Sequence, residues 1–215
     1  MNHSVKLQLK QIAVFILLLA MCTNMLVTAS ASSSLGSLTY WYSDASYIGR
    51  WETSPEISST KLNSNSDFYY ASALATARTQ WNDALDLSMT VSSSGAIQFY
   101  GGTLEELEEL DIWSGLSSST NGITGNYSRT TEGTYTWGST SIKGYIYSGA
   151  ACAVVDNDRT LSRYKKTATH ELGHALGYAG HDSSSISVMY ESGSDNYTLS
   201  SRDKYHLGQV YSSDN

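Results

Sequence analysis

Cysteine is almost absent from this sequence, which limits how the chain can be stabilised. Only Cys22 and Cys152 are present, and Cys22 falls in an N-terminal segment that we expect to be removed. An intramolecular disulfide is therefore excluded from the mature chain, and its stability has to come from packing rather than from covalent cross-links. Cys152 lies in the apolar stretch GAACAVV, and we interpret it as a buried small hydrophobic residue.

Long apolar runs are missing after the first thirty or so residues, which excludes a membrane span there, since a span needs about eighteen or more apolar residues. The start of the chain combines Lys6 and Lys10 with an apolar run at 12–20 and the small residues of 29–31. This pattern is typical of a secretory signal peptide with its cleavage site, which we predict at 1–31. An uncleaved anchor is the alternative.

Basic residues are few, and this excludes one class of partner. The chain has 13 Lys and Arg against 20 Asp and Glu, a formal net charge of −7. Removal of the signal peptide takes away two lysines and no acidic residue, so −7 becomes −9. Such a chain repels the phosphates of nucleic acids. The remainder, 32–215, has the length of one domain with a single core, and we expect a secreted monomer without stable membrane association.

Hydrophobic periodicity predicts a domain that contains both helices and strands. Apolar positions recur every three or four residues at 69–85, and a second helix is predicted at 162–178. A third follows Leu199, where Ser200 and Asp203 form a capping pair. The order of elements predicts an α+β domain, with a twisted mixed sheet of about five strands and three helices in two layers. The strand candidates are 38–44, 96–100, 122–129 and 141–148.

One acidic segment leaves two interpretations open. In TLEELEELDIW, Thr103 and Glu106 fit a capping box, so we interpret the acidic residues as the solvated face of a short helix. A calcium site is the alternative, and the segment DNDR at 156–159 could also supply oxygen ligands.

The strongest chemical signal is HELGHALGYAGH at residues 170–181, which holds three of the four histidines beyond the signal peptide. On a helix, His170 and His174 lie on one face about 5 to 6 Å apart, so both rings can reach one metal ion. Glu171 lies beside that face, where it can hold a water molecule. A polar helix face without an ion is the alternative. The opposite face is apolar and should enter the core: Ala168, Leu172, Ala175 and Leu176.

This stretch, with SVMY at 187–190, resembles the signature of the metzincin zinc peptidases, HExxHxxGxxH with a methionine turn downstream. Within that clan the chain is most similar to the matrixins, because QWNDAL at 80–85 and LSSRDKYHLGQVY at 199–211 also resemble matrixin segments. The resemblance implies a catalytic domain with an active-site cleft. It implies these roles: zinc ligands His170, His174 and His181, general base Glu171, and a hydrophobic floor at Met189.

The third histidine departs from the family spacing by one residue. Three residues separate Gly177 from His181, where the family has two. The added length is about 3.5 Å, which a bulge can absorb, and Gly180 permits the positive φ that such a bulge requires. The eight residues from His181 to Met189 equal the matrixin spacing, so we predict His181 as the third ligand.

Two alternatives to His181 remain open. Asp182 is adjacent, and some relatives of this clan use an aspartate as the third ligand. Glu191 and Asp195 imitate the ExxxD pattern of another HExxH clan, although the Ser-Gly-Ser segment between them is a poor helix former. We interpret His206, in the last predicted helix, as a structural residue.

The resemblance implies a secreted zinc endopeptidase that acts on proteins or peptides through a metal-activated water. The substrate would lie extended beside the strand at 122–129, and the segment 190–197 would wall the pocket for one side chain. Two other function classes remain open. One is a secreted binding or adhesion module that keeps a structural zinc site, and the other is a zinc hydrolase of cell-wall amides.

Overall fold

The structure, a computed structural model, describes residues 33–39, 45–192 and 194–212. The predicted signal peptide at 1–31 lies outside the described residues and stays a prediction. Within the described part of the chain, no helix is both long enough and apolar enough to cross a membrane.

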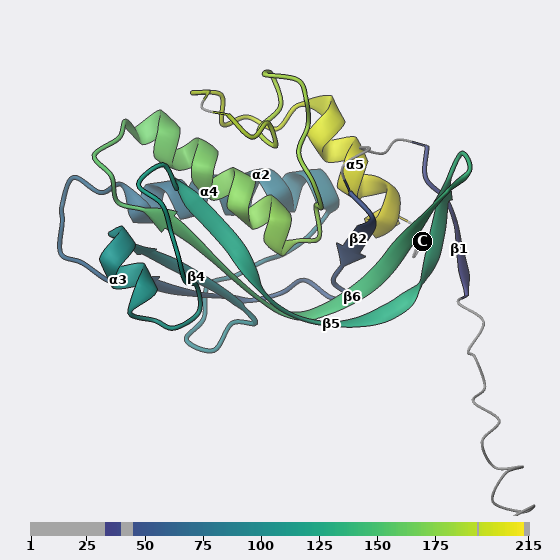
Figure 1. Cartoon of the computed structure of the whole chain (residues 1–215), viewed down its shortest axis with the longest axis horizontal. Helices are drawn as coiled ribbons and strands as arrows, with labels where there is room; N and C mark the ends of the chain where they lie inside the picture. Colours follow the sequence, from purple (N-terminus) through teal and green to yellow (C-terminus); the bar gives the residue numbers. More distant parts are fainter. Residues whose placement is uncertain (1–32, 40–44, 193, 213–215) are drawn as a thin grey trace, which may run out of the picture. The chain divides into compact units, whose positions relative to one another are not determined.

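A six-stranded mixed sheet forms the base of the described domain (Figure 1). Its order is β1-β5-β6-β4-β3, with β2 also paired to β6. Neighbouring strands are parallel except for the long antiparallel hairpin of β5 and β6. This confirms the predicted α+β class, with six strands in place of about five. The strands are β1 (Ser34–Ser37), β2 (Tyr47–Arg50), β3 (Ile57–Lys61), β4 (Ile97–Gly102), β5 (Gly122–Trp137) and β6 (Thr140–Val155).

The strand predicted at 38–44 is wrong where the structure describes it. Leu38 and Thr39 lie outside any strand, and 40–44 lies outside the described residues. The first strand forms earlier because Ser34–Ser37 pairs with the far end of β5, at 134–136. Local β-propensity does not encode such a tertiary pairing. Leu38 is buried in the main core instead.

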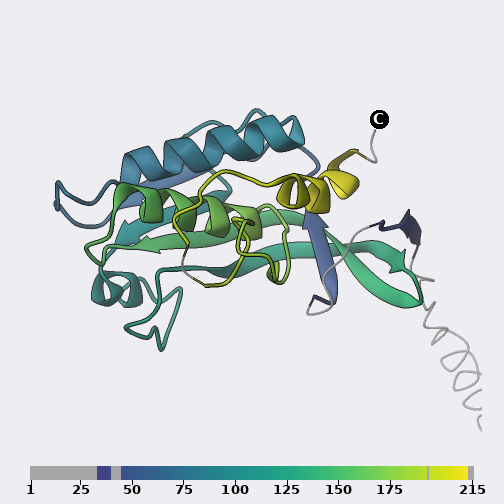
Figure 2. The same ribbon diagram turned by 90° about the horizontal axis from the view of Figure 1, so that it is seen from above.

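Four helices lie within the described residues: α2 (Tyr70–Leu85), α3 (Leu104–Glu108), α4 (Leu161–Ala175) and α5 (Ser201–Tyr211). The three long ones confirm the predicted helices, although α4 ends three residues earlier than expected. The short α3 begins at the predicted capping box of Thr103 and Glu106. Figures 1 and 2 show α2 and α4 side by side over one face of the sheet.

Alternation along β6 divides the interior between the two faces of the sheet. Ala150, Cys152 and Val154 belong to the main core, under α2 and α4. Their neighbours in sequence belong to a smaller cluster with Leu107 of α3, because successive side chains of a strand point to opposite faces. Cys152 is fully buried and is not in a disulfide, as predicted.

The helix that carries the histidine motif is fixed by its apolar face. Trp81 of α2 is fully buried, and its indole Nε1 donates a hydrogen bond of 2.8 Å to the carbonyl of Thr169 in α4. A buried indole needs such a partner, so this bond fixes how the two helices pack against each other. All four residues predicted to face the core are fully buried: Ala168, Leu172, Ala175 and Leu176.

Candidate metal centre

The structure brings the three predicted histidines together. His170 and His174 come from α4, and His181 comes from the loop that follows it. One ring nitrogen of each lies within 4.8 Å of the others, so the group could hold a metal ion. The ring centroid of His181 lies 5.2 Å from that of His170 and 5.1 Å from that of His174. The extra residue in the loop therefore does not keep His181 away.

Two glycines turn the chain back toward α4. Gly177 has a φ of +114°, and a Cβ at this position would meet the carbonyl oxygen of Gly49 at 2.0 Å. Gly180 has a φ of +71°, in the left-handed region that glycine adopts without steric cost. Gly180 thus adopts the positive φ that glycine permits, and the turn returns His181 to the first two rings.

Backbone carbonyls fix the orientation of the first two rings. His170 Nδ1 lies 2.8 Å from the carbonyl of Val188, and His174 Nδ1 lies 2.7 Å from that of Tyr178. A nitrogen that faces a carbonyl carries the proton, so in the neutral rings each Nε2 presents a lone pair. The two Nε2 atoms are 3.1 Å apart. This is the orientation of metal-binding histidines, whose other nitrogen donates to a carbonyl.

Electrostatics keep the first ring neutral. Burial, together with the charges of His174 and Lys166, holds the pKa of His170 well below its usual value. A neutral imidazole is the form that binds a metal ion, since a protonated ring has no lone pair to offer. The donor set present at this site therefore fits a divalent cation.

Glu171 lies beside the triad and is held by the sheet. Its carboxylate Oε2 is 2.6 Å from the hydroxyl of Thr124 on β5. Burial raises the pKa of Glu171 to about 7, and the hydrogen bond from Thr124 and the charge of Lys166 oppose this rise. A cation held by the triad would lower this pKa, because opposite charge favours the carboxylate. The position suits a proton acceptor that works near neutral pH.

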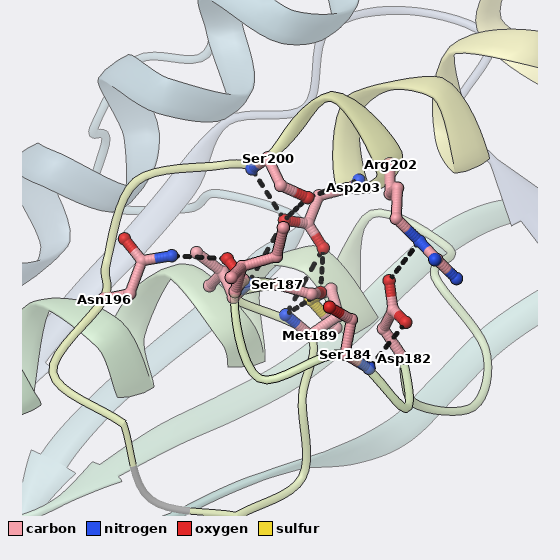
Figure 3. A network of polar contacts seen from close by, with 10 residues as sticks. Asp182, Ser184, Ser187, Met189, Asn196, Ser200, Arg202 and Asp203 are labelled. Atoms are coloured by element: carbon pink, nitrogen blue, oxygen red, sulfur yellow. Dashed lines mark hydrogen bonds and ion pairs between the residues drawn. The ribbon is translucent and has the colours of Figure 1, made fainter.

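The alternative third ligands, Asp182 and the pair Glu191 and Asp195, lie outside the group of side chains that could hold a metal ion. Asp182 has one carboxylate oxygen 3.0 Å from Arg202 Nε and accepts a 2.9 Å hydrogen bond from the Ser184 amide with the other (Figure 3). Asp195 forms an ion pair of 2.8 Å with Arg163. Neither aspartate belongs to the group whose donor atoms lie together. The geometry therefore favours His181 over both.

A buried carboxylate supports the loop beyond the triad. Asp203 of α5 is fully buried and accepts hydrogen bonds from the hydroxyl of Ser187, the Val188 amide at 3.1 Å and the Ser200 amide at 2.8 Å (Figure 3). Val188 donates its amide to Asp203, and its carbonyl faces His170 Nδ1. Asp203 therefore helps to fix the residue that orients the first ring of the triad. The capping box of Ser200 and Asp203 was predicted from the sequence. The hydrogen bonds that Asp203 accepts from Ser187 and Val188 were not.

Two further predicted residues lie near the triad. Met189 is fully buried, and a Cβ added at Gly173 would meet its sulfur at 2.8 Å, so it packs against α4 next to His174. His206 is fully buried on α5, with its ring centroid 4.1 Å from that of Tyr178. Burial lowers the pKa of His206 to about 3. It lies outside the triad, as predicted, and packs as a neutral ring.

A cavity of about 310 Å³ opens from the triad. His170, Glu171 and His181 line one part of it, and Glu191 and Ser194 contribute from the predicted wall segment 190–197. Beside it runs the near half of β5. Since β1 pairs with the far half, Gly122–Arg129 has only β6 as a neighbour among the described strands. The predicted edge therefore exists next to the cavity.

Within the described residues, the three histidines are the one group of His, Cys, Asp or Glu side chains close enough to hold a metal ion. Asp156, a candidate calcium ligand, instead accepts hydrogen bonds from Asn63, Asn65 and Tyr164. A calcium requirement therefore stays a prediction without a candidate site in the part of the chain that the structure describes.

Sequence reasoning missed the partners that come from other elements. Thr124 was placed on the edge strand but not linked to Glu171, and Lys166 was not connected with the cavity. The alternation of β5 could have shown that Thr124 faces the same side as its neighbours two residues away, but not which helix residue it meets. No known family model matches the sequence, and a search of curated proteins finds no match.

Proposed function

We propose that this chain is a secreted zinc-dependent endopeptidase of the metzincin type, similar to the matrixins. The observation that carries the proposal is that three histidine nitrogens lie within 4.8 Å of one another with Glu171 in the same cavity. A triad of neutral imidazoles leaves one coordination position open, which is typical of catalytic rather than structural zinc. The HExxH motif and the downstream Met189 support the same reading.

The residues of the site divide the chemistry between them. When bound, zinc supplies a Lewis acid that polarises the peptide carbonyl and lowers the pKa of a water molecule. Glu171 accepts the proton of the attacking water and delivers it to the leaving amine. Thr124 keeps the carboxylate of Glu171 in position through its 2.6 Å hydrogen bond. The carbonyls of Val188 and Tyr178 keep the rings of His170 and His174 oriented.

The exposed edge of β5 supports a peptide as the substrate. An extended chain can add to Gly122–Arg129 through main-chain hydrogen bonds, as in other cases of strand addition. A peptide bound in this way would lie beside Glu171, because Thr124 lies within that edge. Such recognition depends on the backbone, so it accepts many sequences and leaves selection to the neighbouring cavity.

The same geometry gives less support to the two other functions. A binding or adhesion module with a structural zinc site gains nothing from Glu171, whose burial in the cavity raises its pKa and so costs stability at neutral pH. A hydrolase of cell-wall amides could share the triad and the general base. The edge of β5 favours an extended peptide over a branched cell-wall cross-link.

Metal removal tests the proposal on the secreted protein. We expect cleavage of casein or gelatin to stop when a chelator such as 1,10-phenanthroline removes the metal, and to return when about one zinc ion per chain is restored, because the triad is one site. A serine-protease inhibitor serves as the control and should have no effect. Cleavage that continues without metal would contradict the proposal. Hydrolysis of cell-wall peptides alone would favour the amide hydrolase.

A further inference from the structure

The cavity beside the triad is basic, although the chain as a whole is acidic. Three cationic side chains line it, Arg159, Arg163 and Lys166, whereas the formal net charge of the whole sequence is −7. Two carboxylates share the lining, Glu171 and Glu191. Glu171 is hydrogen-bonded to Thr124, and Glu191 is exposed. A metal ion held by three neutral imidazoles would add two further positive charges at the same place.

Lys166 is the central cation of this cavity. Its side chain is only 7% exposed, and its ammonium group donates a 2.8 Å hydrogen bond to the carbonyl of Tyr190. Among the described residues no carboxylate forms an ion pair with it, so two of its three N–H donors have no acceptor there. Burial lowers the pKa of Lys166, because desolvation disfavours the charged ammonium, and the charges of Glu171 and Asp203 oppose this only in part. An incoming anion would relieve this cost.

The two arginines extend the positive charge along the cavity. Arg163 uses Nε for its ion pair with the exposed Asp195, which leaves the other N–H groups of its guanidinium available. Arg159 is half-buried, and its side chain has no ion pair within the described part of the chain. Guanidinium groups bind carboxylates through paired hydrogen bonds, which are stronger than those between neutral groups.

The position of Lys166 relative to the triad indicates which residue of a substrate would carry the anion. Lys166 and His170 are four residues apart on α4, so they share a face and their Cβ atoms are about 5 to 6 Å apart. Lys166, His170 and His181 also line the same cavity. A substrate group bound at Lys166 therefore belongs to the residue next to the one whose carbonyl is held at the triad. A volume of about 310 Å³ holds an aspartate or glutamate side chain with room to spare.

We propose that this cavity binds the carboxylate of an acidic substrate side chain, Asp or Glu, adjacent to the peptide bond that is cut, and that Lys166 is the main determinant of this specificity. The inference rests on the proposed endopeptidase function and names its substrate class. Peptides with an apolar residue at that position are poor substrates, because they offer no acceptor to the two N–H donors of Lys166 that lack one among the described residues.

The test uses the zinc-loaded protein and internally quenched peptides that differ only in one residue beside the cleaved bond: Glu, Gln, Leu or Lys. Both termini are blocked, so that a terminal carboxylate cannot replace the side chain. We expect kcat/KM for Glu to exceed that for Gln by about 10-fold or more, as for a charge-assisted contact. In Lys166→Met the ratio should fall to about 2-fold or less.

Lys165→Met is the matched control. It removes the same charge from the neighbouring residue, whose ammonium lies 5.0 Å from the centre of the Tyr197 ring and does not line the cavity. The Glu preference should survive this change. If Lys166→Met does not fold, Arg159→Gln, at a half-buried position, should still lower the ratio several-fold.

Calorimetric binding of the same peptides, with the cleaved bond replaced by a reduced amide, separates the two proposals. Cleavage of all peptides without a preference for Glu overturns the specificity and leaves the endopeptidase standing. Tighter binding of the Glu peptide that depends on Lys166, without any cleavage, supports the anion site and overturns the endopeptidase. A Leu peptide with a free C-terminus is added to the series, and its binding in place of the blocked Glu peptide also overturns the proposal, since the bound carboxylate would then be terminal.

Discussion

Replacing Glu171 with alanine is expected to leave zinc bound and to lower kcat for peptide cleavage by about 10²- to 10⁴-fold, the range in which a general base contributes. The metal should stay because Glu171 is not part of the histidine group. Catalysis should fail because Glu171 lines the same cavity as His170 and His181 and is held there by the hydrogen bond from Thr124. Zinc content by mass spectrometry and kcat on a quenched peptide give the two readings.

Glu191→Ala is the matched control for this prediction. Glu191 is the second carboxylate that lines the same cavity, but it is exposed. We expect it to change kcat by no more than a few-fold. The assignment of the general base fails if Glu171→Ala retains most of its activity while holding zinc, or if Glu191→Ala causes the larger loss.

Replacing Asp203 with alanine is expected to lower the free energy of unfolding by about 3 to 5 kcal/mol, because it leaves several buried donors without an acceptor. The orphaned groups are the hydroxyl of Ser187 and the amides of Val188 and Ser200. Zinc affinity should fall as well, since Val188 orients the ring of His170. Urea denaturation with and without zinc measures both effects.

Lys204→Ala controls for a general effect of changing α5. Lys204 is the next residue on the helix and is exposed, so its loss should cost no more than about 0.5 kcal/mol. Equal stability of the Asp203→Ala and Lys204→Ala proteins would show that the network in Figure 3 does not stabilise the loop.

The long helices could be predicted because their signals are local. The apolar stripe of α2, the core face of α4 and the capping box of Ser200 and Asp203 each lie within a few turns of sequence, and the structure confirms them. The first strand could not be predicted in this way. Ser34–Ser37 has little β-propensity of its own and becomes a strand only because the end of β5 is available to pair with it.

The residues of the candidate site also differ in whether their signal is local in the sequence. His170, His174 and Glu171 share one helix, so their spacing alone predicts their relative positions. His181 required an argument about glycine, and the positive φ of Gly180 supports it. Thr124 and Lys166 gain their importance from contacts with other elements. Thr124 is 47 residues from Glu171, and no periodicity joins residues so far apart.

The binding of zinc to the wild type and to His181→Ala tests the central claim most directly, because this histidine departs by one residue from the spacing of the metzincin signature that the sequence resembles. Competition with a chelator of known affinity would give the number of zinc ions per chain and their dissociation constant. We predict one ion per chain in the wild type and an affinity at least about 100-fold lower in His181→Ala, since one of three protein ligands is lost. An unchanged stoichiometry and affinity in His181→Ala would contradict the three-histidine centre.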